Sequence, residues 1–241
     1  MKYIIILIAA ISFNSLQAQN FIDKGLIEYT VVVNNHKAMG EGRWAEMFKD
    51  KIPKLSTSYY QLTFNDNKGT YLFNRKEDKT RSPFGNDAGE ESVWYSDYAN
   101  DKFIQQKVIF GNTYLLSDSL LNINWKMTNE SRNIAGFNCR KAVGVLFDSV
   151  YVFAFYTDEI TVSGGPMGLH GLPGMILGVT IPRMFSSWVA NKIIINGVDF
   201  TKINAPTKGK KKKPRELEGT IIEATKDWGS YGQQAIWNMF L

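Results

Sequence analysis

The sequence predicts a mainly β fold: a single-domain antiparallel β-meander, forming a curved sheet or a partly open barrel, with one or two covering helices that include a C-terminal one. Short runs of β-branched and aromatic residues recur about every 8 to 15 residues, separated by turn-forming residues, which is typical of antiparallel β proteins. Of the 241 residues, 44% are hydrophobic and 13% aromatic, enough for a substantial core. No internal repeat or linker-like segment divides the chain, so we expect one domain.

A series of segments has the composition of β-strands. They are Leu26–Val33, Tyr60–Phe64, Thr70–Asn74, Ser92–Tyr95, Phe103–Phe110, Thr113–Ser117, Trp125–Thr128, Cys139–Phe147, Val150–Thr157, Met175–Ile181, Ser187–Ile195 and Leu217–Ile222. Asn65–Gly69 predicts a hairpin loop, because Asn, Asp and Gly tolerate a positive φ, and Phe147–Val150 predicts a second tight reversal. Since most connections are short, we expect neighbouring strands to pair in order.

The segment Val150–Tyr156 is apolar at every position, whereas a strand with one solvated face alternates apolar and polar residues. We therefore expect a central strand that is covered on both faces. Two predicted helices would provide the cover. Glu41–Lys51 carries apolar residues at helical spacing, and an aromatic-rich tail follows Thr225, although its glycines weaken that prediction.

The N-terminal residues have the pattern of a secretory signal peptide. Lys2 precedes an apolar run from Tyr3 to Phe13 that is too short to span a bilayer, and Ala18 supplies the small residue that the cleavage site requires. A buried strand or a membrane anchor is the alternative. We expect residues 1–18 to be removed and residues 19–241 to form the mature domain, exported to the periplasm or secreted, with no transmembrane segment after cleavage.

The net charge of +5 is a mild excess and does not predict nucleic-acid binding. Much of it lies in the basic segment 207–215. Its cations are Lys208, Lys210, Lys211, Lys212, Lys213 and Arg215. We expect a solvated loop between the last two strands. The alternative is a weak attraction of Lys210, Lys211, Lys212 and Lys213 to an anionic surface such as lipopolysaccharide.

One cysteine excludes an internal disulfide framework and a four-thiolate zinc site, and two histidines leave almost nothing for a multi-histidine metal centre. Cys139 has no cysteine or histidine beside it, so we interpret it as a small buried residue rather than a reactive thiol or half of an intermolecular disulfide. Met167, His170 and Met175 are a ligand set that suits copper(I), but methionine also fills apolar space. We expect no metal and no cofactor.

A glycine-rich segment is the most distinctive feature of the chain. Its glycines are Gly164, Gly165, Gly168, Gly171, Gly174 and Gly178. Leu172-Pro173-Gly174 suits a type II turn with Gly174 at the positive-φ position. A phosphate cradle leads into a helix and carries a lysine or a hydroxyl group, whereas this segment is apolar and leads into a strand. We interpret it as a structural loop that seals one end of the sheet; a groove for a lipid or a peptide is the alternative.

The motif Gly171-Leu172-Pro173-Gly174-Met175-Ile176-Leu177 resembles the signature of the GLPGLI family of exported Bacteroidetes proteins, with Met175 where leucine is usual. Further positions fit the family in the expected order. They are Trp125, Gly136, Cys139, Lys141, Ala142, Tyr156, Thr157, Gly165 and Pro166. The resemblance implies export, a β-rich domain and a structurally demanding loop; it implies no catalytic activity and no ligand.

Catalytic signals are weak. The histidines are His36 and His170, and a serine hydrolase site would have to combine His170 with Ser163 or Asp158, whose spacing gives no support. Trp94, Tyr95 and Tyr98 could form a platform for a sugar, but aromatic residues at this density are more often part of a core. We therefore expect no catalytic residues.

Three functions remain, and we rank them. A cell-envelope interaction or accessory protein comes first, with an envelope protein as its partner. A periplasmic carrier of an apolar ligand, either a lipid or a peptide, comes second, and a hydrolase third. A continuous apolar cavity of about 300 Å³ or more would favour the carrier.

The mature protein is expected to begin at Gln19, because the short apolar run and Ala18 specify cleavage there. Intact-mass measurement of protein exported by a Bacteroidetes host tests this, and a product that retains Met1 to Ala18 would contradict it.

Overall fold

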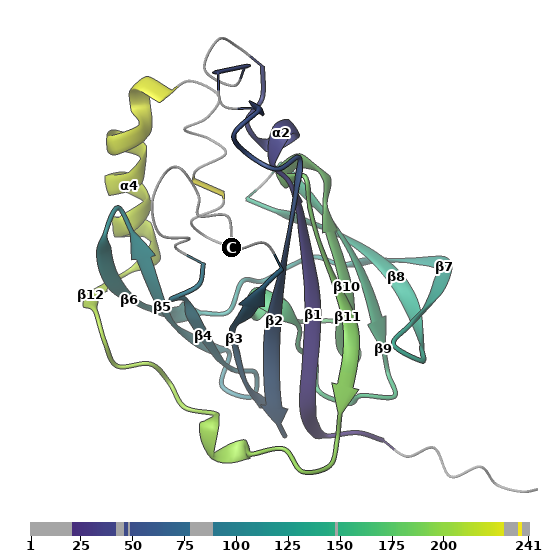
Figure 1. Ribbon diagram of the computed structural model, residues 1–241. Helices are drawn as coiled ribbons and strands as arrows, with labels where there is room; N and C mark the ends of the chain where they lie inside the picture. Colours follow the sequence, from purple (N-terminus) through teal and green to yellow (C-terminus); the bar gives the residue numbers. More distant parts are fainter. Residues whose placement is uncertain are drawn as a thin grey trace, which may run out of the picture.

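The computed structural model describes residues 21–41, 46, 47, 49–77, 89–147, 149–228, 236 and 237. They form one sheet (Figure 1) with the strand order β12-β6-β5-β4-β3-β2-β1-β11-β10-β9-β8-β7. The strands are β1 (Lys24–Asn34), β2 (Leu55–Asn65), β3 (Lys68–Lys76), β4 (Val93–Asp97), β5 (Lys102–Ile109), β6 (Asn112–Ser119), β7 (Lys126–Ile134), β8 (Phe137–Leu146), β9 (Val150–Thr157), β10 (Met175–Ile181), β11 (Ser186–Ile194) and β12 (Lys210–Lys212). The mainly β prediction is confirmed.

The sheet consists of two meanders. Strands β1 to β6 pair in order and antiparallel, as do β7 to β11, and the pairing of β1 with β11 joins the two sets. The predicted hairpin loops are present: Asn65 pairs with Lys68, and Leu146 with Val150. Two further connections, Phe110-Gly111 and Ala135-Gly136, have positive φ at both residues, the pattern of a type I′ turn.

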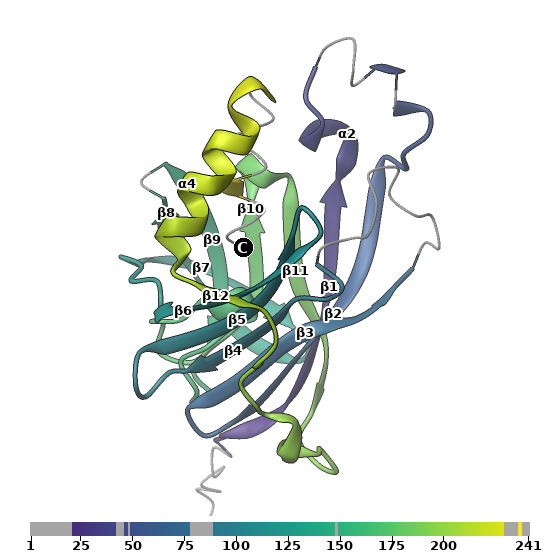
Figure 2. The same ribbon diagram turned by 90° about the vertical axis from the view of Figure 1, so that its left-hand side faces the viewer.

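The connection between β6 and β7 forces the sheet to curl. These strands are ten positions apart in the sheet order, which corresponds to about 48 Å in a flat sheet. The six residues from Leu120 to Trp125 that join them reach at most about 25 Å. The two halves of the sheet therefore face each other, with β3–β6 in front of β8–β10 in Figure 2. Among the described residues the sheet does not close.

Helix α4 (Pro214–Thr225) covers the β5–β6 end of the sheet (Figure 1). Its buried residues Leu217, Ile221 and Thr225 recur every four positions, and the first two pack with Phe103 and Leu116 of the sheet. The expected strand over Leu217–Ile222 is therefore wrong. In so short a segment the apolar residues fit both the alternation of a strand and one face of a helix. Pro214 stands at the start of the helix, a position where proline is favoured.

The basic segment 207–215 is also not the expected loop between two strands. Lys210–Lys212 forms β12, which pairs parallel with Tyr114–Leu116 of β6 at one edge of the sheet, and α4 follows it. Lysines on an edge strand discourage another chain from pairing with it. The lysine run thus protects an edge.

The apolar strand β9 is covered on both faces only in its second half. Tyr151 is 59% exposed, whereas Phe155 on the same face and Tyr156 on the opposite face are buried. Cations of neighbouring strands, rather than a helix, lie over its outer aromatic rings: the Lys141 ammonium is 5.1 Å from the centroid of Phe153, and the Arg132 guanidinium is 4.8 Å from that of Phe155. The expectation of complete cover is wrong for Tyr151.

The remaining short elements lie outside the sheet. They are α2 (Asn35–Ala38), η1 (Pro166–Gly168), η2 (Pro182–Met184), η3 (Phe200–Lys202) and η4 (Lys226–Trp228). The helices expected over Glu41–Lys51 and after Thr225 fall partly outside the described residues; of the tail, Trp237 is buried in the core and Arg183 lies over its ring. No helix in the described part of the chain is long and apolar enough to cross a membrane.

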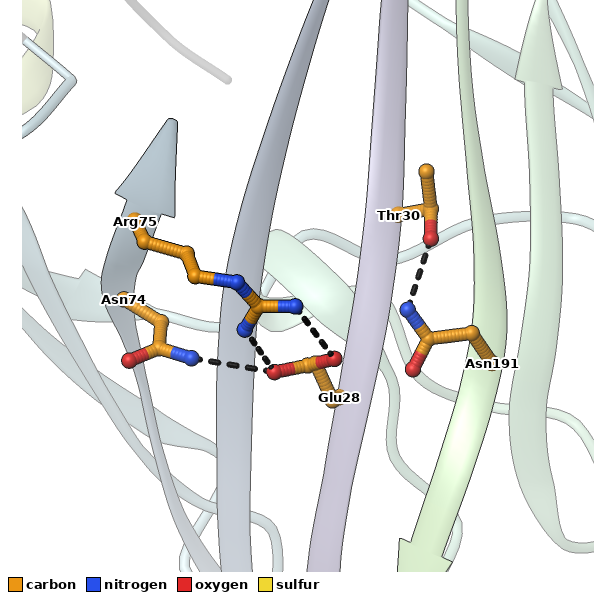
Figure 3. A network of polar contacts seen from close by, with 5 residues as sticks. All are labelled: Glu28, Thr30, Asn74, Arg75 and Asn191. Carbon is orange, nitrogen blue, oxygen red and sulfur yellow. Dashed lines mark hydrogen bonds and ion pairs between the residues drawn. The ribbon is translucent and has the colours of Figure 1, made fainter. Parts of the chain in front are cut away.

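A polar network ties three strands together on the outer face of the sheet (Figure 3). The Glu28 carboxylate on β1 accepts hydrogen bonds from Arg75, which binds both of its oxygens, and from Asn74 Nδ2 at 3.0 Å, both on β3. Asn191 on β11 donates to Thr30 Oγ1 at 2.7 Å. The hydrogen bond from Arg75 is the main reason that the pKa of Glu28 lies below its usual value.

The network gives a pH-dependent prediction. Because the folded-state pKa of Glu28 is lowered, its contribution is present above the ordinary glutamate pKa of about 4.3 and is lost as pH falls through the lowered value. Arg75→Gln should therefore lower the urea midpoint at pH 7, and the difference from wild type should shrink in strong acid. Lys102→Gln, an exposed cation outside the network, is the control. A difference for Arg75→Gln that is constant with pH would contradict the prediction.

Candidate functional site

The glycine-rich segment forms a loop, residues 158–174, that joins β9 to β10 and lies inside the curled sheet. Its short helix η1 contacts β3 and β4, which lie far from β9 and β10 in the sheet order. The loop therefore crosses from one half of the sheet to the other. Met167, Leu169 and Leu172 are each less than 5% exposed and belong to the main core.

Backbone hydrogen bonds hold this loop in place. Ile176 N donates to Gly164 O at 2.8 Å and Met175 N to Ile160 O at 3.1 Å, so the loop runs back along β10. Ile160 also forms a bridge with Ile22, just before β1. From the neighbouring wall, the buried Tyr29 hydroxyl donates to Ile176 O at 2.6 Å. The loop is thus a fixed part of the core.

The turn at Gly174 is tighter than the expected type II turn. Gly174 N donates to Leu172 O at 2.8 Å, which is the pattern of a γ-turn centred on Pro173. The predicted positive φ is present, at 129°. A Cβ atom on Gly174 would lie 2.0 Å from Thr157 O, so the residue must be glycine for its conformation and for its contact with the backbone of β9.

Three aromatic rings lie against glycines of the loop. A Cβ atom would lie 2.3 Å from Trp94 Nε1 at Gly168, and 2.7 Å from the Tyr98 ring at Gly164. On the other side Trp125 faces Gly171, and its Nε1 donates to His170 O at 2.8 Å. The sheet and the loop are therefore too close for side chains at Gly164 and Gly168.

At this contact three polar side-chain atoms have no close hydrogen-bond partner within the part of the chain that the structure describes. They are Trp94 Nε1, Tyr98 Oη and His170 Nε2, all buried. The rings of Tyr98 and His170 are 6.4 Å apart. Burial raises the pKa of Tyr98 to about 12 and lowers that of His170, so both side chains are uncharged at neutral pH. Trp94 and Tyr98 thus face the loop and do not form an exposed platform with Tyr95.

One protein-family model matches part of the chain. It is described as "Protein of unknown function (Porph_ging)" and matches residues 144–178, a stretch that contains the whole Gly171–Leu177 motif. No curated protein matches the sequence.

Two of the matching solved structures share the fold at low sequence identity. Two structures of PNGF-II, in space groups P21 and C2, give TM-scores of 0.55 and 0.52 at 17% and 18% identity. They match 82% and 81% of this chain but only 33% and 32% of their own, so the chain spans about a third of the length of PNGF-II. An uncharacterized conserved protein from Thermus thermophilus is 5% identical, with a TM-score of 0.38 over 77% of this chain and 90% of that chain.

The other positions on which the resemblance to the GLPGLI family rests lie on β7, β8 and β9 and their connections. Thr157 pairs with Met175 and is buried, as are Ala142 and Tyr156. The Tyr156 hydroxyl donates to Met127 Sδ at 3.4 Å.

Other positions of this set lie at the surface, in turns or in the loop. Lys141 forms an ion pair with Glu130 at 2.6 Å. Gly136 has a φ of 91° in the β7–β8 turn. Gly165 and Pro166 lie in the loop itself, where Gly165 packs against Ile176.

The residues weighed as catalytic are engaged elsewhere. Ser163 Oγ accepts from Gly171 N at 3.1 Å, and Asp158 forms an ion pair with Arg140 at 2.6 Å. His36 lies in α2, where its Nε2 is 2.9 Å from Ile52 O. In the ranges that the structure describes, no group of three His, Cys, Asp or Glu side chains could hold a metal ion.

Gly174→Ala should be strongly destabilising, by about 3 kcal/mol or more, because strain at positive φ adds to the clash with Thr157 O. Two controls separate these causes. Gly111→Ala has positive φ but open space and should cost about 1 kcal/mol, whereas Gly219→Ala in α4 should stabilise by about 0.5–1 kcal/mol. Urea denaturation measures all three, and equal effects of Gly174→Ala and Gly111→Ala would refute the contact.

Cys139 should not react with a thiol reagent in the native state. It is fully buried on β8, and burial is the main reason that its pKa is raised to about 11. Labelling with Ellman's reagent is expected only when urea is added. Rapid labelling without denaturant would show that the thiol is accessible.

Proposed function

We propose that this protein is an exported member of the GLPGLI family that acts as an interaction or accessory protein of the cell envelope. The observation that carries the proposal is that the space inside the curled sheet is occupied by the protein's own glycine-rich loop. The loop packs so closely that a Cβ atom at Gly164, Gly168 or Gly174 would overlap neighbouring atoms. This part of the interior is therefore closed to a ligand. Binding would then take place at the outer surface.

Family membership and export rest on the sequence. The family-model match includes the motif Gly171–Leu177, and the signal-peptide pattern of residues 1–18 fits an exported family. Residues 1–20 are not among those described, so the leader is tested by the N-terminus of the exported protein.

The second candidate is a carrier of an apolar ligand. It is favoured by the curled shape of the sheet and by the apolar character of the loop. It is weakened by the burial of Leu169, Leu172 and Ile176 among other residues of the core. A hydrolase ranks third, because Ser163 and Asp158 are engaged in other contacts.

Two measurements on exported protein test the proposal. An interaction protein should not take up the apolar probe N-phenyl-1-naphthylamine. A photo-crosslinker placed at Val145 or at Tyr151, which are paired and exposed on β8 and β9, should give the same adduct with one envelope protein. A crosslinker at Lys102 is the control position.

Stoichiometric uptake of the probe, with no adduct from either position, would replace the proposal by the carrier. Turnover of ester or glycoside substrates that disappears in His170→Ala would replace it by the hydrolase.

A further inference from the structure

A pocket of about 420 Å³ lies where two turns of the sheet meet the connection that follows β11. The β2–β3 turn contributes residues 65–68 and the β4–β5 turn contributes Asp97, Ala99 and Asn100. Phe200 of η3 and the following Ile203 complete the lining. The volume is in the range of sites for small molecules.

The pocket walls are held before any ligand binds. Tyr98 N donates to Asn67 O at 2.7 Å, which fixes one turn to the other. The Asp97 carboxylate accepts from Asn100 N at 3.1 Å and from its Nδ2 at 2.9 Å. On the third wall, the Asp199 side chain caps η3 by accepting from Thr201 N at 3.1 Å. Little entropy would therefore be lost in ordering these segments around a ligand.

The lining combines donors and acceptors with little net charge. Asn65, Asn67 and Asn100 supply carboxamides, each of which can donate and accept. The lining also holds two carboxylates, those of Asp66 and Asp97, and one ammonium group, that of Lys68. The hydrogen bond from Asn100 is the main reason that the pKa of Asp97 is lowered, so this carboxylate is an ionised acceptor at neutral pH.

These features select one class of ligand. Two carboxylates disfavour a phosphate or another anion, and the many polar groups disfavour a lipid. A sugar fits, because each hydroxyl group both donates and accepts, and Phe200 with Ile203 offers an apolar wall to the C–H face of a sugar ring. A peptide strand would need an unpaired sheet edge, whereas Asn65 and Lys68 already pair with each other.

We propose that this pocket binds a neutral sugar residue of a free oligosaccharide or of a larger glycan chain. The carboxamides and carboxylates bind its hydroxyl groups, and Phe200 contacts its ring. The proposal is independent of the compartment and of any partner at β8 and β9.

Titration of the full-length exported protein, labelled with ¹⁵N and followed by NMR, tests the proposal. The probes are maltose, cellobiose, mannobiose and chitobiose, each followed by the longer oligosaccharide of the same sugar. At least one disaccharide should cause saturable shifts of the amides of Asn67, Lys68, Asn100 and Phe200. Tighter binding of the longer chain would identify a glycan as the source, and equal binding would identify a free oligosaccharide.

Variants locate the binding site. Asn67→Ala and Phe200→Ala should each weaken binding about tenfold or more, because a hydrogen-bonding side chain or the stacking wall is lost. The matched controls, Asn138→Ala in the β7–β8 hairpin and Phe185→Ala after η2, should leave binding unchanged. Should Phe200→Ala fail to fold, Phe200→Leu, which keeps an apolar side chain but lacks the ring, replaces it, with a loss in the same direction.

Three results would overturn the proposal: no saturable shift with any of the probes, shifts that persist in Asn67→Ala and in the Phe200 variant, or shifts of the pocket amides by calcium chloride alone. The last result would make the pocket a cation site.

Discussion

The six-residue connection between β6 and β7 is the constraint on which the rest of the structure depends. It brings together strands that lie ten positions apart in the sheet, so the sheet must curl and its concave side becomes an interior that has to be filled. The loop that joins β9 to β10 fills part of it. Because sheet and loop approach so closely, side chains are excluded at Gly168 and Gly174, and the high glycine content of the loop follows from this geometry.

Much of the fold could be predicted from local sequence. Alternation and turn residues located the strands of both meanders, and Asn65–Gly69 indicated its hairpin. The errors lie in short segments whose apolar residues fit both the strand and the helix periodicity. Leu217–Ile222 reads as a strand but packs as a helix, and the polar residues 129–133 extend β7 although they lack alternation, because an edge strand has less apolar surface to bury.

The candidate site was predictable only in part. The positive φ of Gly174 follows from its Leu-Pro-Gly context, whereas the packing of Gly168 on Trp94 and of Gly164 on Tyr98 depends on a curl that no local pattern reveals. The pocket is a similar case. Its Asn and Asp residues read as ordinary turn formers, and only the pairing order places them beside Phe200.

The pairing of β1 with β11 also determines the order in which the chain can fold. Strand β1 ends at Asn34, and β11, which pairs with one of its edges, begins only at Ser186. That edge of β1 therefore stays open until nearly the whole domain has been synthesised. The first meander can form early from local hairpins, but its apolar face gains its cover only when the second arrives. Such non-local pairing slows folding and leaves an exposed strand edge in the nascent chain, so this domain depends on being kept apart from other chains until its last strands emerge.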